Sequence, residues 1–299
     1  MTFQRTLRRQ VACAGIGLHS GQKVTLGLKP APADSGIRFR RSDLGTDIPA
    51  SVVHLSGTNH ATGLSRNGAT VDTVEHLLAA LVSLGIDNVT VELDRNEVPV
   101  MDGSAAPFVY LLQEAGTKTL STPRRYLKVL RPITVSRGDK MMSLYPAESF
   151  RVSYSISFDH PLLRHQSQTF QMTEASFIDE IAPARTFGFL HEVELMRQQG
   201  LALGGSLENA IVLSETGVLN NTLRFEDEFV RHKILDAIGD LALVGYPILG
   251  HLVASRAGHA LHTAFARQLL SEPDAWKIVE LQPAPLSVVV PAGVPVRAN

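Results

Sequence analysis

The sequence has 299 residues, of which 44% are hydrophobic and 19% are charged, and its formal net charge at pH 7 is −1. This length and composition predict one or two compact domains with a sizeable core, and neither half is basic enough to indicate a broad nucleic-acid or acidic-membrane surface. The single cysteine, Cys13, excludes an intrachain disulfide and a thiolate metal cage, as expected in the reducing cytoplasm.

The N-terminus places Arg5, Arg8 and Arg9 before a short apolar stretch, residues 11–18. That stretch contains glycines and leads into a turn at residues 19–23, so we expect no signal peptide. No apolar run reaches the roughly 18 residues that a membrane-spanning helix requires. We therefore expect a cytoplasmic protein without a transmembrane segment. We also expect a monomer, although no sequence feature fixes the oligomeric state.

The first half of the chain predicts short strands and two helices. Alternating residues rich in Val, Thr and Leu indicate strands, which we place at residues 23–30, 36–40 and 88–93. The first helix, residues 73–84, has one apolar face and ends at Gly85. Ser104 is predicted as the N-cap of a second helix, with Pro107 in its first turn and Gly116 after its end.

The polar segment 117–125 is the predicted linker between an N-terminal α+β domain, residues 1–122, and a C-terminal one, residues 126–299. The second half predicts strands at residues 126–135, 140–145, 151–157, 168–172, 248–255 and 276–281. Helices are predicted at residues 225–244 and about 260–270. Both halves share the order strands, helix with a histidine near its start, strand, helix, which suggests a duplicated unit.

The helix predicted at residues 225–244 has an unusual polar face. At about 100° per residue its apolar side chains fall on one side. On the other side, four polar residues recur at intervals of four: Glu228, His232, Asp236 and Asp240. Gly239 lies among them, although glycine costs about 1 kcal/mol in a helix interior. His and Asp four residues apart can chelate one cation; the alternative is a hydrogen bond on a surface helix.

A histidine on the first helix completes a zinc-binding set. A catalytic zinc needs three protein ligands, an open position, and a nearby carboxylate that takes the proton of water. His76, His232 and Asp236 supply the ligands, and Glu75 supplies the carboxylate. Without the second cluster, Glu75 and His76 would be interpreted as a polar pair at a helix rim. The set predicts a zinc-dependent amide hydrolase.

His259 follows Gly258 at the start of the last predicted helix. The helix dipole there favours a neutral histidine, whereas an opposing carboxylate, Asp240, would hold it protonated and oriented. A protonated histidine opposite the base can donate its proton to an amide leaving nitrogen. The alternative is a histidine that only caps the helix.

These residues lie within longer strings that match one known family. The strings are VDTVEHLL from Val71, MDGSA from Met101, ARTFGF from Ala184, LGGSLENA from Leu203, FVRHKILDAIGDL from Phe229 and GHAL from Gly258. Together they resemble UDP-3-O-acyl-N-acetylglucosamine deacetylase, the zinc enzyme of the committed step of lipid A synthesis in Gram-negative bacteria. The similarity runs in order from about Arg5 to Pro283, essentially the whole chain.

The resemblance implies an α+β fold of two similar domains, each a β-sheet with two helices, with the helices packed between the two sheets. It implies one Zn²⁺ per chain, or Fe²⁺ in the cell, on His76, His232 and Asp236. The substrate it implies is a UDP-linked acylated amino sugar, which is a small molecule and not a nucleic acid.

The resemblance also implies catalytic roles by matching position. Glu75 would be the general base, and His259 the general acid supported by Asp240. Thr186 would donate to the tetrahedral oxyanion, and Lys233 would join the catalytic group at the sugar–diphosphate end.

Substrate-binding residues are implied in the same way. Lys140 and Arg256 would face the sugar–diphosphate, and Phe158 the uridine, with Phe187 beside them. Arg256 stands where the family is expected to have lysine, which keeps the charge but changes the geometry. A second departure is Asn59-His60-Ala61 on the acyl side, where Thr-Met-Ser is common.

An insert at about residues 189–213 is implied to shelter the acyl chain. Residues 190–199 predict a short amphipathic helix, and residues 210–213 a strand. Gly205, Ser206 and Ala210 are its predicted substrate-binding residues, since small side chains beside larger aliphatic ones leave a narrow passage. The alternative is an insert that only packs on its own domain.

Two other hypotheses for the function stay open at this point. One is a zinc amidohydrolase that acts on another N-acyl sugar; action on peptides is disfavoured because His-Glu-x-x-His is absent from the sequence. The other is a non-catalytic metal- or RNA-binding protein, which would need neither Glu75 nor His259.

Overall fold

The computed structural model describes residues 2–219 and 222–281. Residues 282–299 of the predicted second domain, with Pro283 among them, lie outside the described residues. The helices and short helical turns are η1 (Val52–His54), α1 (Glu75–Ser83), α2 (Ala106–Ala115), α3 (Glu174–Ser176), η2 (Phe177–Ile181), α4 (Leu190–Gln198), α5 (Glu228–Leu241), η3 (Ala242–Val244), α6 (His259–Ser271) and η4 (Pro273–Ala275).

The strands divide between the two halves of the chain. Those of the first half are β1 (Phe3–Leu7), β2 (Val11–Ile16), β3 (Lys23–Pro30), β4 (Ile37–Arg41), β5 (Thr46–Pro49), β6 (Leu55–Gly57), β7 (Gly63–Arg66), β8 (Ala69–Val71), β9 (Val89–Leu93) and β10 (Thr117–Pro123). Those of the second half are β11 (Arg125–Val129), β12 (Ile133–Arg137), β13 (Lys140–Pro146), β14 (Phe150–Ile156), β15 (Gln166–Gln171), β16 (Phe187–Phe189), β17 (Ile211–Leu213), β18 (Ile248–Ser255) and β19 (Trp276–Glu280).

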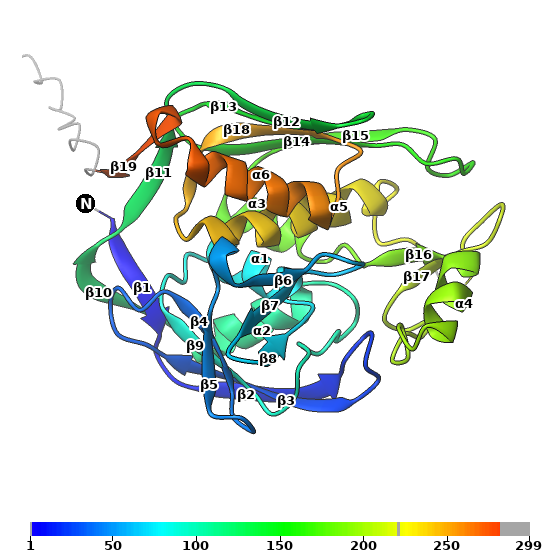
Figure 1. Cartoon of the computed structure of the whole chain (residues 1–299), viewed down its shortest axis with the longest axis horizontal. Helices are drawn as coiled ribbons and strands as arrows, with labels where there is room; N and C mark the ends of the chain where they lie inside the picture. Colours follow the sequence, from blue (N-terminus) through cyan, green and yellow to red (C-terminus); the bar gives the residue numbers. More distant parts are fainter. Residues whose placement is uncertain (1, 220–221, 282–299) are drawn as a thin grey trace, which may run out of the picture.

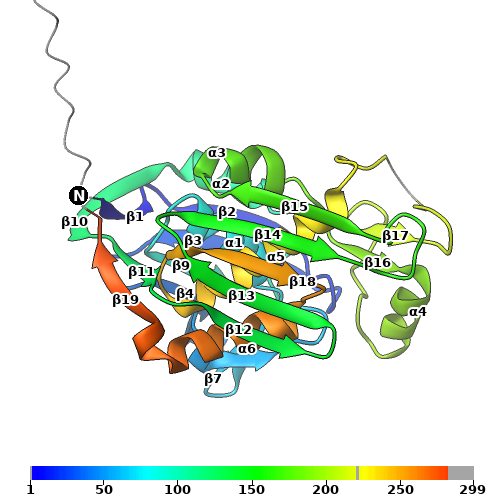
Figure 2. The ribbon, with the colours of Figure 1, turned by 90° about the horizontal axis from the view of Figure 1, so that it is seen from above.

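Two sheets form the outer layers of the molecule, and the main helices lie between them (Figure 1). One sheet has the strand order β2-β3-β9-β4-β5; the other has the order β12-β13-β18-β11-β19, with β14 pairing both β18 and β15. Figure 2 shows the second sheet from above, lying across α5 and α6. The predicted α+β class and the predicted packing of helices between two sheets are confirmed.

Each half contains the same crossover. β4 pairs parallel to β9, and α1 lies in the connection between these two strands. β14 pairs parallel to β18, and α5 lies in that connection. Because each connection places a helix on the inner face of its sheet, α1 and α5 meet at the centre of the molecule, as the suggested duplication requires.

Three local predictions are corrected by the structure. Most of the predicted linker is strand β10, which pairs antiparallel to β1 with Thr117 opposite Leu7. The N-cap of α2 is Ala105 and not Ser104; the Ser104 hydroxyl still accepts the main-chain N–H of Ala106, at 3.2 Å. The single strand predicted at residues 126–135 is divided into β11 and β12, because Pro132 between them cannot donate to a strand ladder.

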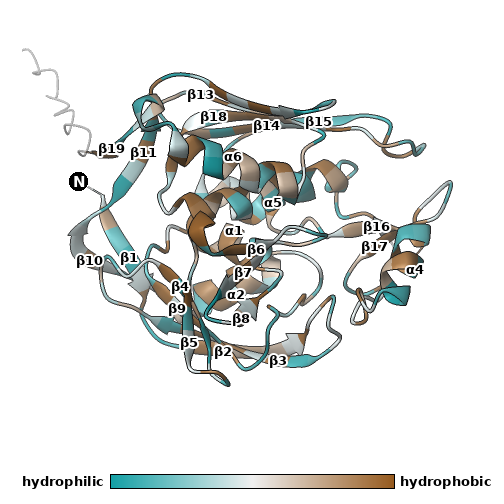
Figure 3. Ribbon diagram, viewed as in Figure 1, coloured by the Kyte–Doolittle hydropathy of each residue, from teal (hydrophilic) through white to brown (hydrophobic). Residues whose placement is uncertain are grey.

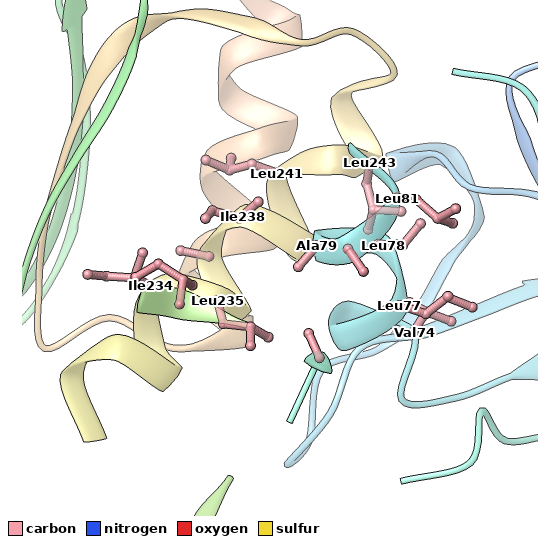
Figure 4. Packing of buried hydrophobic residues seen from close by; sticks show 14 of the residues in the cluster. Val74, Leu77, Leu78, Ala79, Leu81, Ile234, Leu235, Ile238, Leu241 and Leu243 are labelled. Carbon is pink, nitrogen blue, oxygen red and sulfur yellow. The ribbon is translucent and has the colours of Figure 1, made fainter. Parts of the chain in front are cut away.

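Hydrophobic residues recur along α1, α5 and α6 between the two sheets (Figure 3), and many of them are buried. At the centre, side chains of α1, among them Leu78 and Ala79, lie next to those of α5, among them Leu235 and Ile238 (Figure 4). Burying a side chain of the size of leucine is worth about 1.5–3 kcal/mol, so this contact joins the two halves firmly. The polar face of α5 is therefore held in a fixed position relative to the start of α1.

The predicted insert stands beside the layers (Figure 1). It contains α4 and β17, and β17 pairs parallel to β16. None of the helices in the described part of the chain is both long and apolar enough to cross a membrane.

Candidate active site

The start of α1 meets the middle of α5 in the interior of the molecule. Glu75 and His76 are the first two residues of α1, and α5 carries His232, Asp236 and Asp240 at intervals of four residues. The polar face of α5 is buried and not solvated, since these three residues are at most 2% exposed. The structure thus brings His76 together with His232 and Asp236, which lie far away in the sequence.

The side chains of His76, His232 and Asp236 converge on one point. Asp236 Oδ1 lies 3.3 Å from His232 Nε2 and 3.5 Å from His76 Nε2. One possible ligand atom from each residue lies within 4.8 Å of the other two. Two imidazole nitrogens and one carboxylate oxygen are a ligand set typical of catalytic zinc.

Two details show that these residues fit a bound cation. Asp236 Oδ1 is buried and has no hydrogen-bond partner among the described residues, an arrangement that is costly for a carboxylate oxygen unless a cation compensates it. His232 Nδ1 donates to the carbonyl oxygen of Ala184, at 3.1 Å, so its Nε2 lone pair faces Asp236. Burial lowers the pKa of His232 to about 3, so the ring is neutral and able to bind a metal.

The other oxygen of Asp236 is held by Lys233, whose Nζ lies 2.8 Å from Oδ2. Burial alone would raise the pKa of Asp236, but the neighbouring His232 and Lys233 outweigh burial and lower the pKa well below its ordinary value. Asp236 is therefore ionised. Lys233, predicted from the sequence as part of the catalytic group, lies beside the convergent residues.

Glu75, the predicted general base, is buried beside the same point. Its Oε2 accepts the main-chain N–H of Thr62, at 3.0 Å, and its Oε1 lies 3.9 Å from His259 Nε2. Burial raises the pKa of Glu75. A raised carboxyl pKa moves the group toward the pH at which a general base is most effective.

His259, the predicted general acid, is the first residue of α6, after Gly258 at the N-cap. Its Nδ1 donates to Asp240 Oδ2, at 2.8 Å. Burial alone would lower the pKa of His259, but the carboxylates of Asp240 and Asp236 outweigh it and raise the pKa to about 9. Of the two opposing influences considered from the sequence, the carboxylate prevails over the helix dipole, and His259 is protonated at neutral pH.

A second group of possible ligand atoms consists of Asp240, His259 and His262. Its polar atoms already satisfy one another: Asp240 Oδ2 accepts from both imidazoles at 2.8 Å, and Oδ1 accepts from the Thr62 hydroxyl at 2.5 Å. In contrast to Asp236 Oδ1, no oxygen of Asp240 is left without a partner. This group is therefore suited to holding a proton and not to holding a cation.

An aromatic cluster lines one side of the site. The ring of Phe187 meets those of Phe158 and Phe229 edge to face, with centroid distances of 6.0 Å and 5.0 Å. Lys233 Nζ lies 5.5 Å from the centre of the Phe187 ring. Thr186 precedes Phe187. The main-chain N–H of Thr186 donates to the carbonyl oxygen of Gly103, at 2.8 Å. Phe158, which is distant in the sequence, thus lies beside Thr186 and Phe187 at the start of strand β16.

The two predicted cations of the second sheet are exposed. Lys140 is the first residue of β13, at the hairpin with β12. Arg256 follows β18 and forms an ion pair with Asp139 in the same hairpin, at 2.9 Å. Arg256 is thus already paired with one carboxylate in this structure.

The insert exposes apolar side chains. In α4 no residue is buried, and four leucines of the insert are exposed: Leu190, Leu195, Leu203 and Leu207. Exposed apolar side chains that gather in one segment are typical of a surface that binds an apolar partner.

Gly205, Ser206 and Ala210 lie in one turn of the insert, in which the Ala210 N–H donates to the carbonyl of Ser206, at 3.1 Å. The turn lies against the first half of the chain. A Cβ built on Gly204 would be 2.2 Å from the carbonyl oxygen of Gly17. Gly204 is therefore required for this close approach.

Sequence reasoning missed Thr62 and His262, and it placed Glu228 on the polar face of the long helix without giving it a role. The His259–His262 spacing of one helical turn was a usable signal; a threonine outside any motif gave none. Glu228 shares the polar spacing of α5 but forms a buried ion pair with Arg185, at 2.8 Å. The carboxylate of Glu228 is thus occupied by Arg185 and does not belong to the site.

Comparison with known proteins gives consistent results. The family model described as UDP-3-O-acyl N-acetylglycosamine deacetylase matches residues 4–271. A UDP-3-O-acyl-N-acetylglucosamine deacetylase of Pseudomonas entomophila is 49% identical over 299 residues, which cover 97% of this chain and 99% of the relative. Enzymes of the same name from Anaeromyxobacter dehalogenans and Shewanella oneidensis are 52% identical over 93% of this chain and 91% of the relative, and 48% identical over 98% and 99%.

Proposed function

The chain belongs to the UDP-3-O-acyl N-acetylglycosamine deacetylase family and is a hydrolase of lipid A biosynthesis, and we propose that it removes the acetyl group of UDP-3-O-acyl-N-acetylglucosamine where α1, α5 and α6 meet. Family membership overrules the alternative of a non-catalytic metal- or RNA-binding protein. The observation that carries the proposed site is the buried Oδ1 of Asp236, which has no hydrogen-bond partner in the described part of the chain and faces two imidazole nitrogens.

The metal we propose is one Zn²⁺ per chain, held by His76, His232 and Asp236, with Fe²⁺ as the alternative in the cell. Two imidazoles and one carboxylate suit either ion. When bound, zinc supplies Lewis acidity toward the amide carbonyl and toward water. The ligands support this role because His232 is neutral and Asp236 is ionised.

Glu75 and His259 divide the proton transfers between them. Glu75 accepts a proton from the attacking water, and His259 donates its Nε2 proton to the nitrogen that leaves as the free amine. The two functional atoms face each other at 3.9 Å, so one substrate amide can reach both. Asp240 holds the opposite nitrogen of His259, which keeps Nε2–H directed into the site.

The remaining predicted residues complete the proposal. Thr186 donates to the oxygen that becomes negative when water adds to the amide. Lys233, which lies beside Asp236, and the exposed Lys140 and Arg256 supply the positive charges that bind the sugar–diphosphate end. Phe158 and Phe187 offer apolar rings to the uridine end of the substrate.

The acyl chain is assigned to the insert. Each CH₂ removed from water is worth about 0.8 kcal/mol, so a long chain gains much from an apolar surface. The exposed leucines of the insert, with Gly205, Ser206 and Ala210 in the adjoining turn, support this assignment.

We keep the division into domains at residues 1–122 and 126–299 as a proposal; the separate sheets of the two halves support it. We also propose a monomer in the cytoplasm with this small molecule as its partner. The single thiol and the net charge of −1 support that environment and the absence of a nucleic-acid partner.

The test measures zinc content and acetate release on the same preparations. Wild type should hold one zinc per chain and release acetate faster from the 3-O-acylated substrate than from UDP-N-acetylglucosamine. His232→Ala should lose most of both, because two protein ligands rarely retain zinc. His165→Ala, an exposed histidine, is the matched control and should lose neither. Full zinc occupancy in His232→Ala would falsify the proposed site.

A further inference from the structure

A second buried histidine shares the carboxylate of Asp240. His262 lies one helical turn after His259 on α6 and is 0% exposed. Its Nδ1 lies 2.8 Å from Asp240 Oδ2, the same oxygen that His259 Nδ1 contacts at 2.8 Å. The proposed reaction assigns no role to His262.

The hydrogen bonds fix which nitrogen of His262 carries the proton. An ionised carboxylate only accepts, so the Nδ1 of His262 must donate to Asp240. In a neutral ring the Nε2 then carries a lone pair, and the Tyr154 hydroxyl lies 2.8 Å from it and donates to it. Burial lowers the pKa of His262 and raises that of Tyr154, which is consistent with a neutral ring and an intact phenol.

Asp240 thereby receives donors from three directions. Thr62 donates to Oδ1, and His259 and His262 donate to Oδ2. A carboxylate with three donors in fixed places cannot rotate without breaking a hydrogen bond to a buried charge, and such bonds are strong. The carboxylate is therefore oriented toward His259 before any substrate binds.

We propose that His262, which donates from Nδ1 to Asp240 while its Nε2 accepts from Tyr154, is a positioning residue that keeps Asp240 aligned on His259. This inference rests on the proposed function, because it acts through the assigned acid. Loss of the His262 donor frees one side of Asp240, and loss of the Tyr154 hydroxyl leaves Nε2 of His262 without its hydrogen-bond donor. Neither change touches the residues proposed to bind metal or substrate.

Two substitutions of His262 separate positioning from packing. His262→Asn keeps an N–H near the position of Nδ1, and His262→Leu keeps similar bulk without a donor. We expect kcat of His262→Leu to fall by about ten-fold or more, as is typical when a supporting hydrogen bond is lost, with KM within about two-fold. His262→Asn should recover most of kcat. Rates are expressed per zinc-loaded, folded chain, and His165→Leu is the surface control.

A spectroscopic measurement tests the same inference without turnover. Imidazole ¹⁵N resonances of zinc-loaded wild type should show His262 protonated at Nδ1 only, and in Tyr154→Phe the Nε2 resonance should shift because Nε2 has lost its hydrogen-bond donor. Equal kcat for His262→Leu and wild type, equal loss in His262→Asn and His262→Leu, or an Nε2–H tautomer in wild type would each overturn the inference. Inactive wild type contradicts the proposed function itself, whereas active wild type with fully active His262→Leu contradicts this inference alone.

Discussion

Gly239 of α5 lies directly against the main-chain carbonyl of Glu75: a Cβ built on Gly239 would be 2.0 Å from that oxygen and 2.7 Å from the carbonyl carbon. Only a residue without a side chain allows α5 to approach the start of α1 this closely. The approach sets the separation between His76 on one helix and His232 and Asp236 on the other. The glycine that weakens the helix thus has a structural reason.

Gly239→Ala should therefore destabilise the protein and weaken its metal site. Alanine favours the helix by about 1 kcal/mol over glycine, but overpacking against a main-chain carbonyl costs about 1–3 kcal/mol. We expect a lower melting temperature and a weaker zinc affinity, measured by thermal unfolding and by competition with a chelator. Gly217→Ala, where an added Cβ meets nothing within 4 Å, is the control. A rise in melting temperature with unchanged zinc affinity would contradict this role of Gly239.

The general-base assignment is tested by Glu75→Gln, which keeps the size of the side chain and removes its basicity. We expect zinc content to stay near that of wild type and kcat to fall on the order of 10² or more, as loss of a general base does. Acetate release and metal analysis on the same sample check this. If Glu75→Gln keeps most of its turnover, another group accepts the proton.

Repeating patterns allowed much of the fold and site to be predicted, and isolated residues did not. β3 has the bounds predicted from alternation, and β18 has the bounds predicted for a strand after the long helix. The four-residue spacing of His232 and Asp236 correctly placed them on one face of that helix. The residues of β10 were predicted as a linker because their polar composition does not indicate a strand. Only the pairing with β1, which the sequence does not show, identifies them as one. The Thr62 contacts to Glu75 and Asp240 join segments that no local pattern connects.

The exposed leucines of the insert provide a test of acyl-chain binding. Leu195 and Leu203 are 54% and 55% exposed, so replacing both by serine should change the free energy of unfolding little. We expect kcat/KM on the long-acyl substrate to fall about ten-fold, equivalent to about 1.4 kcal/mol, with little change on UDP-N-acetylglucosamine. Leu44→Ser, at a residue 55% exposed outside the insert, should affect neither. Equal loss on both substrates would mean that the insert supports the fold and does not bind the chain.

Titration of Asp72 should lower the free energy of unfolding as the pH rises. Burial, and after it the charge of Glu97, raises the pKa of Asp72 to about 6, whereas an unfolded aspartate titrates near about 3.9. The folded state therefore holds this proton more tightly; its stabilising contribution is complete below about pH 4 and is lost as the pH rises to about 6.

Asp72→Asn removes this titration. We expect the melting temperature of Asp72→Asn to exceed that of wild type at pH 8, with a difference that shrinks as the pH falls through the interval from about 6 to about 4. Asp159→Asn, on an exposed loop, is the control and should show no such trend. A difference in melting temperature that is constant from pH 4 to pH 8 would show that Asp72 does not titrate in this range.

Anomalous X-ray scattering from crystals of the zinc-loaded protein tests the central claim most directly. Data collected on both sides of the zinc absorption edge locate the ion without reference to activity. We predict one strong peak per chain, flanked by His76 Nε2, His232 Nε2 and Asp236 Oδ1, the oxygen that otherwise has no partner among the described residues. A principal peak at the Asp240, His259 and His262 group, with none beside Asp236, would contradict the account.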